Sequence, residues 1–195
     1  MKLNKLLMIF TIIGFLFLFM GSVSAEPLVD WYEATDSGTT EYLFGVNYDG
    51  TNWIAVGANG TILTATNPTG TWTEQTSGTT EYLRGVNYDG TNWVAVGYNG
   101  TILTTTDPTG TWTSQTSGTT EYLFGVNYDG TNWVAVGVNG TILTATDPTG
   151  TWTSQTSGTT EYLFGVNYDG TNWIAVGANG TILTCLLYTS DAADE

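Results

Sequence analysis

A unit of forty residues recurs along most of this chain, and it restricts the fold more than any other feature of the sequence. Three full units span 37–76, 77–116 and 117–156, and a partial unit spans 157–184. Self-similarity at about 20–50 residues is typical of solenoids, propellers and other arrays in which each unit packs on its neighbours. The period is marked by Trp53, Trp93, Trp133 and Trp173, and again by Trp72, Trp112 and Trp152.

Each unit contains four short segments with the composition of β-strands, at 82–88, 92–98, 101–105 and 111–116 in the second unit. Thr, Val, Ile, Trp and Tyr favour strands, and the intervening glycines disfavour helices. Asp89-Gly90 and Asn99-Gly100 are tight-hairpin sequences, and Pro108 ends pairing in a longer turn. We therefore predict an all-β fold, a β-propeller whose blades are four-stranded antiparallel sheets. A β-solenoid with two coils per unit is the alternative, and the three turns per unit disfavour it.

The fourth unit stops before its last strand, which indicates an incomplete arc of a larger ring rather than a closed ring of four blades. Residues 26–36, around Trp31, resemble a lone outer strand of the kind that completes the last blade of a ring. An open arc exposes one apolar face, on which we expect Leu163, Val166, Trp173 and Val176. Such a face predicts self-association of the chain.

The two ends of the chain differ from the repeats. Residues 1–25 have Lys2 and Lys5 before an apolar run and small residues before Glu26, the pattern of a cleaved secretory signal peptide. An uncleaved membrane anchor is the alternative. One reverse translation of residues 185–195 resembles the end of a transposase-type sequencing adapter, so we expect this segment not to be native.

The charge of the chain excludes several partners. Arg84 is the only Lys or Arg after residue 25, against eighteen acidic residues. Such a surface disfavours nucleic acid and anionic membranes, because both are bound through Lys and Arg. The chain has no histidine, and Cys185 is its only cysteine. We expect neither disulfides nor a zinc site, and no cofactor.

The turn and strand from Thr106 to Trp112, and again from Thr146 to Trp152, resemble the Asp-box of bacterial-neuraminidase-type repeats, a family of propellers that includes some similar to photosystem II assembly factors. Asp107 and Asp147 stand five residues before Trp112 and Trp152, as in that motif, and Trp72 follows Asn67 at the same spacing. Thr109 departs from the motif, whose glycine comes one residue earlier than Gly110. The resemblance implies that these Asp and Trp residues are structural. Sialidases of the family use several arginines, which this chain lacks.

The carboxylates recur at equivalent places in every unit, at Glu81, Glu121 and Glu161 and in the Asp-Gly turns. Glycosidases need two carboxylates in unlike environments, so we expect no catalytic residue. Calcium could use the oxygens of the Tyr-Asp-Gly-Thr-Asn turns, but a hairpin explains these residues more simply.

Arg84 and Tyr98 break the repetition, because the other units have Phe and either Ala or Val at these places. We take Arg84 and Tyr98 as candidate binding residues; drift at tolerant positions is the alternative. The sequence predicts a secreted or surface-displayed propeller that binds a protein or glycan without catalysis. A purely structural array, and a fragment of a sialidase-like or other glycoside hydrolase with its active site beyond Thr184, stay open.

Overall fold

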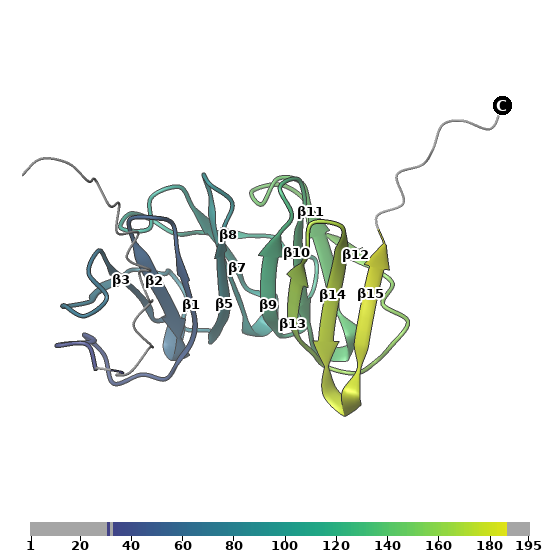
Figure 1. The fold of residues 1–195 in the computed structure, drawn as a ribbon, viewed down its shortest axis with the longest axis horizontal. Helices are drawn as coiled ribbons and strands as arrows, with labels where there is room; N and C mark the ends of the chain where they lie inside the picture. The colour runs from purple at the N-terminus through teal and green to yellow at the C-terminus, as the bar shows by residue number, and fades with distance from the viewer. Residues whose placement is uncertain (1–30, 32, 187–195) are drawn as a thin grey trace, which may run out of the picture. The chain divides into compact units, whose positions relative to one another are not determined.

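A computed structural model of the chain describes residue 31 and residues 33–186, and the repeats lie in one unit that begins at Glu33. The described strands form three four-stranded antiparallel sheets and one three-stranded sheet, each in sequence order (Figure 1). We call these sheets blades 1 to 4.

Blade 1 consists of β1 (Leu43–Tyr48), β2 (Trp53–Gly57), β3 (Ile62–Ala65) and β4 (Thr73–Gln75). Blade 2 consists of β5 (Leu83–Tyr88), β6 (Trp93–Gly97), β7 (Ile102–Thr105) and β8 (Thr113–Gln115). Blade 3 consists of β9 (Leu123–Tyr128), β10 (Trp133–Gly137), β11 (Ile142–Ala145) and β12 (Thr153–Gln155). Blade 4 consists of β13 (Leu163–Tyr168), β14 (Asn172–Gly177) and β15 (Ile182–Leu186).

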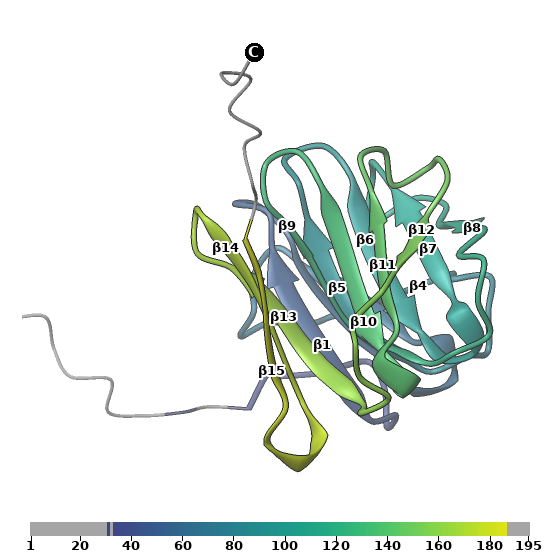
Figure 2. The same cartoon turned by 90° about the vertical axis from the view of Figure 1, so that its right-hand side faces the viewer.

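The first strands of the four blades are neighbours. β5 contacts β1 on one side and β9 on the other, and β9 also contacts β13. Figure 1 shows β1, β5, β9 and β13 following one another across the view, and Figure 2 shows the later strands of blades 2 and 3 extending away from β5 and β9. This is the arrangement of propeller blades, with inner strands together and outer strands apart, so the predicted fold class is confirmed.

Two tight turns per blade were predicted, and one of them was assigned the wrong length. Asn99 and Gly100 both have positive φ (54° and 65°), and the Thr101 amide donates to the Tyr98 carbonyl at 3.0 Å. This is the predicted two-residue turn, in which Asn and Gly tolerate the left-handed region. The Asp89-Gly90 turn instead spans four residues, because the Asp89 carboxylate accepts the amides of Thr91 (2.7 Å) and Asn92 (2.6 Å).

Adjacent blades pack through two different apolar faces. The leading face of a blade points toward the preceding blade, and in blade 2 it consists of Leu83, Val86, Trp93, Ala95 and Leu103. The trailing face points toward the following blade, and in blade 1 it consists of Ile54, Val56 and Ile62. These eight side chains form one buried cluster with Trp112. The same pairing is repeated between blades 2 and 3 and between blades 3 and 4. Strand alternation places the two sets on opposite faces of each sheet, so the blade core is buried on both sides.

An asparagine chain joins the inner strands across the blades. The side-chain amide of Asn47 donates to the Asn87 side-chain oxygen at 2.9 Å, Asn87 donates to Asn127 at 2.7 Å, and Asn127 donates to Asn167 at 2.8 Å. Each oxygen also accepts the amide of the next residue in its own strand, as in Asn87 and Tyr88 at 2.7 Å. Every asparagine therefore fixes both its own strand and the neighbouring blade.

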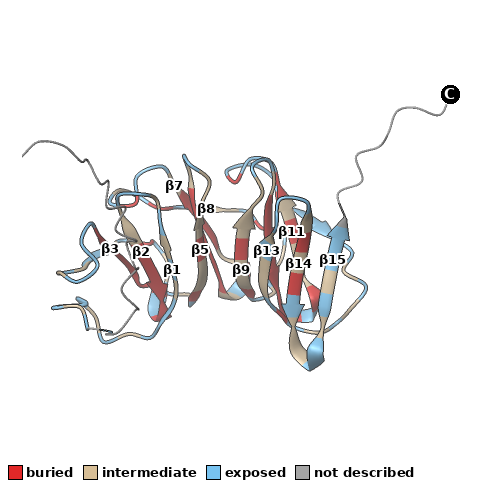
Figure 3. Cartoon of the chain, viewed as in Figure 1, coloured by how far each residue is buried: buried red, intermediate tan, exposed pale blue. Residues whose placement is uncertain are grey.

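The outer faces of blades 1 and 4 are open, as Figure 3 shows by the loss of buried residues toward β1 and β15. On the leading face of blade 1, Val46 is 60% exposed, whereas its equivalents Val86 and Val126 are 7% and 8% exposed. On the trailing face of blade 4, Ile182 is 69% exposed, whereas Ile102 is fully buried. The described blades thus form an arc with two unpaired faces.

The composition of the terminal face was predicted only in part. Val176 is 46% exposed, as expected. Leu163 and Trp173 are buried, and Val166 packs against the same cluster as they do, which lies between blades 3 and 4. These three side chains belong to the leading face of blade 4, so assigning them to its open face was wrong. The exposed set is Ile182 and Val176, with Ile174 half-buried beside them.

The ends of the chain are described only in part. The signal peptide predicted at 1–25 and all of 187–195 lie outside the described residues. From the predicted outer strand at 26–36, the structure describes one parallel bridge between Asp36 and Thr71. In the described part of the chain, no helix has the length and apolar character needed to cross a membrane.

The Asp129 turn connects two blades and leads to a pH prediction. Partial burial raises the pKa of Asp129, but hydrogen bonds from Asn132, Thr131 and Trp173 outweigh it, so the pKa is lowered. Trp173, from blade 4, donates its indole N–H to Asp129 at 3.1 Å. A lowered folded-state pKa gives stabilisation that is complete above the unfolded-state pKa of about 4 and is lost as pH falls through the folded value.

We expect Asp129→Asn to lower the free energy of unfolding at pH 7 by roughly 1 kcal/mol, since hydrogen bonds to charged groups contribute about 1.5–3 kcal/mol and solvent weakens this one. Denaturant titrations from pH 7 to pH 2.5 should show the difference from wild type shrinking below about pH 4. Asp169→Asn, in the same turn of blade 4, is the control. An Asp129→Asn deficit that persists unchanged at the lowest pH contradicts the assignment.

Candidate functional site

Exposed and half-buried aromatic side chains form a continuous strip at one end of the inner strands. We call this set the aromatic rim; it consists of Phe44, Tyr82, Arg84, Tyr98, Tyr122, Phe124, Tyr162 and Phe164. Tyr122, Tyr162 and Phe164 are 44%, 45% and 53% exposed. Ring contacts link the set from blade 1 to blade 4, beginning with Phe44 and Tyr82 at 6.1 Å and ending with Phe124 and Phe164 at 5.6 Å. Contiguous exposed apolar surface of this kind marks interaction sites.

A β-bulge in each inner strand builds the rim. In blade 2, Leu83 pairs with Gly97 and Gly85 pairs with Val96, so Arg84 has no partner across the ladder. Phe44, Phe124 and Phe164 occupy the same bulged position in the other blades. A bulge turns a side chain away from the regular alternation of a strand. A large side chain at this position therefore adds to the rim rather than to the core.

Arg84 lies between two aromatic rings from neighbouring blades. Its guanidinium carbon is 4.2 Å from the centre of the Phe44 ring and 5.5 Å from the centre of the Phe124 ring. Both distances are within the range of cation–π attraction, which holds the cation without consuming its N–H donors. In the described part of the chain Arg84 forms no ion pair. Its planar donors remain available to a carboxylate, and it is the only cation among residues 33–186.

Tyr98 fills the centre of the rim. It begins the turn η2 (Tyr98–Gly100), and its ring stacks on Tyr122 at 4.1 Å and on Tyr82 at 5.3 Å. Ala58 and Val138 occupy this position in blades 1 and 3 and are buried, whereas the larger Tyr98 is half-buried. The structure therefore brings the two candidate binding residues, Arg84 and Tyr98, into one aromatic surface on blade 2.

Two of the acidic residues next to the rim are hydrogen-bonded within their own blades. Glu121 accepts the Asn139 side-chain amide at 3.1 Å, and Glu161 accepts that of Asn179 at 2.8 Å. Among residues 33–185, no group of three His, Cys, Asp or Glu residues has metal-binding geometry. The rim offers aromatic faces, tyrosine hydroxyls and one guanidinium. This chemistry suits binding by stacking and by charge-assisted hydrogen bonds.

The residues of the Asp-box resemblance lie at the opposite, outer edge of the blades. Asp107 accepts the hydroxyl of Thr109 at 2.7 Å and its amide at 3.0 Å, and these two hydrogen bonds lower the pKa of Asp107. Asp147 binds Thr149 in the same way, and its pKa is lowered for the same reason. Each carboxylate thus holds its own turn closed.

The tryptophans of the same segments pack into the blades. Trp112 and Trp152 are both 4% exposed, and their indole N–H groups donate to Pro108 and Pro148 carbonyls at 3.4 and 3.2 Å. Trp72 makes the same hydrogen bond to Pro68 at 3.2 Å and is half-buried. None of these side chains reaches the rim.

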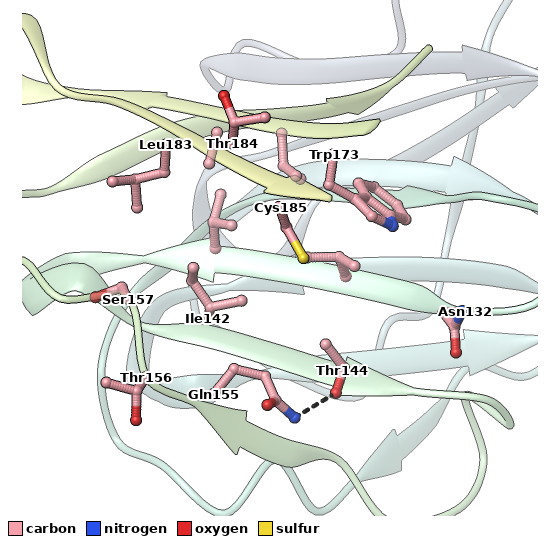
Figure 4. Close-up of a pocket in the computed structure, with 14 residues that line it drawn as sticks. Asn132, Ile142, Thr144, Gln155, Thr156, Ser157, Trp173, Leu183, Thr184 and Cys185 are labelled. Carbon is pink, nitrogen blue, oxygen red and sulfur yellow. Dashed lines mark hydrogen bonds between the residues drawn. The ribbon is translucent and has the colours of Figure 1, made fainter. Parts of the chain in front are cut away.

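A cavity of about 400 Å³ lies between blades 3 and 4 (Figure 4). Its walls include Ile142 and Gln155 of blade 3 and Trp173 and Leu183 of blade 4. In the preceding junctions, Trp112 and Trp152 of the turn before the outer strand belong to the buried clusters. Blade 4 has no described outer strand, so the cavity lies where a tryptophan equivalent to Trp112 and Trp152 would pack. It is a gap in a repeated core, and the rim lies elsewhere.

The strands define a β-propeller with an aromatic strip along its inner strands, and comparisons with known proteins agree on the fold. No family model matches the chain, and no curated protein is significantly similar to it. Among solved structures, YCF48 from Cyanidioschyzon merolae has a TM-score of 0.61 and 17% identity, over 73% of this chain and 50% of that chain. YCF48 bound to D1 peptide has a TM-score of 0.67 and 18% identity, over 85% and 58%. The computationally designed Ika4 protein has a TM-score of 0.68 and 14% identity, over 81% and 99%.

This chain therefore spans about half the length of YCF48. Identities this low establish a shared propeller fold alone. The Asp-box assignment and the roles of Arg84 and Tyr98 stay predictions.

Sequence reasoning missed most of the rim. Tyr82, Tyr122 and Tyr162 were assigned to strands or their edges, with no indication that they stack on the neighbouring blade. The available signal was local: each of these tyrosines stands two residues before the bulged position, which holds Phe or Arg. The bulge itself has no sequence signature beyond the glycine that follows, so the exposure of both positions could not be deduced.

Proposed function

We propose that this chain is a non-catalytic, protein-binding propeller and that the aromatic rim is its binding surface. The observation on which this rests is the guanidinium of Arg84, held between the Phe44 and Phe124 rings without a carboxylate partner among the described residues. Tyrosine, phenylalanine and arginine are the side chains enriched at protein interfaces, and Tyr and Arg are frequent hot spots.

The chemistry of the rim specifies the kind of partner. The chain has a formal net charge of −15, so it repels most acidic proteins at long range. A partner segment that combines one Asp, Glu or terminal carboxylate with apolar or aromatic neighbours fits Arg84 and the surrounding rings. The solved complex of YCF48 with D1 peptide supports peptide binding as a use of this fold.

The double variant Arg84→Phe/Tyr98→Ala tests the proposal with a matched background, because it gives blade 2 the residues that blade 1 has at Phe44 and Ala58. The wild-type chain is screened against an array of peptides that vary in acidic and aromatic content, and hits are measured by fluorescence titration. We expect the double variant to fold normally and to bind hits at least about tenfold more weakly, as for loss of a hot spot. Hits that bind both chains equally, or an absence of hits, contradict the proposal.

Glycan binding is the second candidate, since exposed aromatic rings also stack on sugars. A glycan array probed with wild type and with the single variants Tyr98→Ala and Arg84→Phe distinguishes protein binding from glycan binding: binding of neutral glycans that Tyr98→Ala weakens and Arg84→Phe does not favours glycan binding. A glycoside hydrolase with its active residues outside this sequence is a further alternative, and turnover of chromogenic glycosides by a longer chain would support it. We also propose that the chain acts outside the cell or at its surface, from the signal-peptide pattern at 1–25.

A further inference from the structure

We infer that two copies of this chain associate head to tail, with the trailing face of blade 4 of each copy docking on the leading face of blade 1 of the other. This inference is independent of the rim and concerns the two open faces of the arc. A second copy is the expected occupant of each open face because the chain itself already contains the docked form of the same two faces.

The leading face of blade 1 is a copy of faces that are buried elsewhere. Leu43, Val46, Trp53, Ala55 and Leu63 are identical to Leu83, Val86, Trp93, Ala95 and Leu103, which pack on blade 1. Leu43 and Val46 are 42% and 60% exposed, whereas Leu83 and Val86 are 0% and 7% exposed. Leu43 and Val46 of this face are thus uncovered and Trp53 is half-buried, whereas Ala55 and Leu63 are already buried within blade 1.

The trailing face of blade 4 is the matching half. Ile174, Val176 and Ile182 are identical to Ile54, Val56 and Ile62 of blade 1, which are fully buried under the leading face of blade 2. A contact between blade 4 of one copy and blade 1 of another therefore has the same residues on both sides as the junction between blades 1 and 2.

Polar groups at the edges match in the same direction. Asn167 accepts from Asn127, and no described hydrogen bond uses its own side-chain amide, which would donate to Asn47 of the second copy. The indole of Trp53 would face Asp169 of the second copy; at the junction of blades 3 and 4 the equivalent Trp173 donates to Asp129, whereas at the other two junctions the indole N–H of Trp93 and Trp133 is unpaired. A glycine is also in place: a Cβ on Gly140 meets the Thr159 carbonyl at 2.1 Å, whereas one on Gly180 meets nothing within 4 Å. Gly180 leaves room for the Thr39 turn of a following blade.

The number of copies follows from the blade count. Propellers close with about four to eight blades, and four blades of this chain leave both end faces open. Two copies supply eight blades and close the ring, whereas three copies exceed the usual range. Since the contact is heterologous, closure is what prevents open filaments.

The test uses one substitution on each open face, Val46→Asp and Ile182→Asp, at positions exposed in the single chain. Analytical ultracentrifugation of wild type at moderate salt, which screens the net charge of −15, should show a concentration-dependent dimer. Each variant should associate at least about a hundredfold more weakly, because a carboxylate enters an apolar contact. Thr113→Asp, on the exposed side of β8, should dimerise as wild type.

Mixing the two variants gives the decisive readout. One contact in the mixture has no substitution, so Val46→Asp and Ile182→Asp together should form a heterodimer that neither forms alone. Unfolding curves confirm that both variants are folded. Wild type that stays monomeric at all concentrations overturns the inference. An effect of Ile182→Asp without one of Val46→Asp, which would mean a symmetric contact, also overturns it, as do open polymers in place of a dimer.

Discussion

Replacing Trp133 with alanine is expected to lower the free energy of unfolding by about 3–5 kcal/mol, the usual cost of truncating a fully buried tryptophan. Trp133 is 0% exposed and lies in the cluster between blades 2 and 3, where Val94 and Val96 face it. Removal of the indole leaves a cavity between two blades that cannot close without shifting one of them. Urea titration, followed by far-UV circular dichroism, measures the change.

The repeat supplies a matched control for this experiment. Trp53 occupies the same place in blade 1, where no preceding blade covers it, and is half-buried. At a concentration where the chain is monomeric, Trp53→Ala should cost about 1–2 kcal/mol, because less area is removed from contact. Equal losses for the two variants would show that blade 3 does not pack on blade 2 through this side chain.

Trp133→Phe should lower the free energy of unfolding by less than Trp133→Ala does, for two reasons: phenylalanine fills more of the cavity, and it removes a buried donor. The indole N–H of Trp133 is buried without a hydrogen-bond partner in the described structure, as is that of Trp93. The indole N–H of Trp93 lies near the carboxylate of Asp49 and contributes to lowering the pKa of Asp49. It does not have the geometry of a hydrogen bond to that carboxylate. Phenylalanine removes the unpaired donor and keeps most of the apolar surface.

Gly140→Ala is expected to lower the free energy of unfolding by about 2–3 kcal/mol more than Gly180→Ala does. This difference lies in the upper part of the range that overpacking usually costs. Both glycines have positive φ, 67° and 73°, so both variants have the same cost of placing alanine in the left-handed region. They differ in their surroundings, since only the Gly140 Cβ strikes the Thr159 carbonyl of blade 4. The amide of Gly140 also donates to the Glu161 carbonyl at 2.9 Å, so the junction cannot simply widen.

Thermal and urea unfolding of the two glycine variants, at a concentration where the chain is monomeric, measures this difference. Gly50→Ala, in a turn whose Cβ position is open and whose φ is 99°, controls for turn strain alone. If Gly140→Ala and Gly180→Ala unfold together, the close approach of blades 3 and 4 at this turn is wrong.

The architecture could be predicted from the sequence because the turn residues of each blade are recognisable within its own forty-residue unit. Asn99-Gly100 and the apolar run that begins at Trp93 define a hairpin whose strand ends differ from the prediction by at most one residue. The spacing of Trp93 and Trp133 gives the period directly. Local chemistry was sufficient here, since the turn residues and the strand residues of each unit indicate the same structure.

The contacts between blades could not be predicted in this way. Which face of β14 is covered depends on the handedness of the stacking, and the sequence shows only that both faces are apolar. Trp173 and Leu163 were therefore assigned to the open face, although both pack between blades 3 and 4. The rim was missed for a related reason: Tyr98 and Tyr122 lie in different units, and nothing local indicates that their rings meet.

The asparagine chain has a direction, since Asn47, Asn87 and Asn127 each donate toward the next blade and none donates back. A further forty-residue copy inserted in frame would accept from the blade before it and donate to the blade after it, so each existing asparagine would keep an equivalent partner. Duplication of this stretch of the gene would thus lengthen the array without new compensating mutations, and loss of a copy would shorten it just as simply.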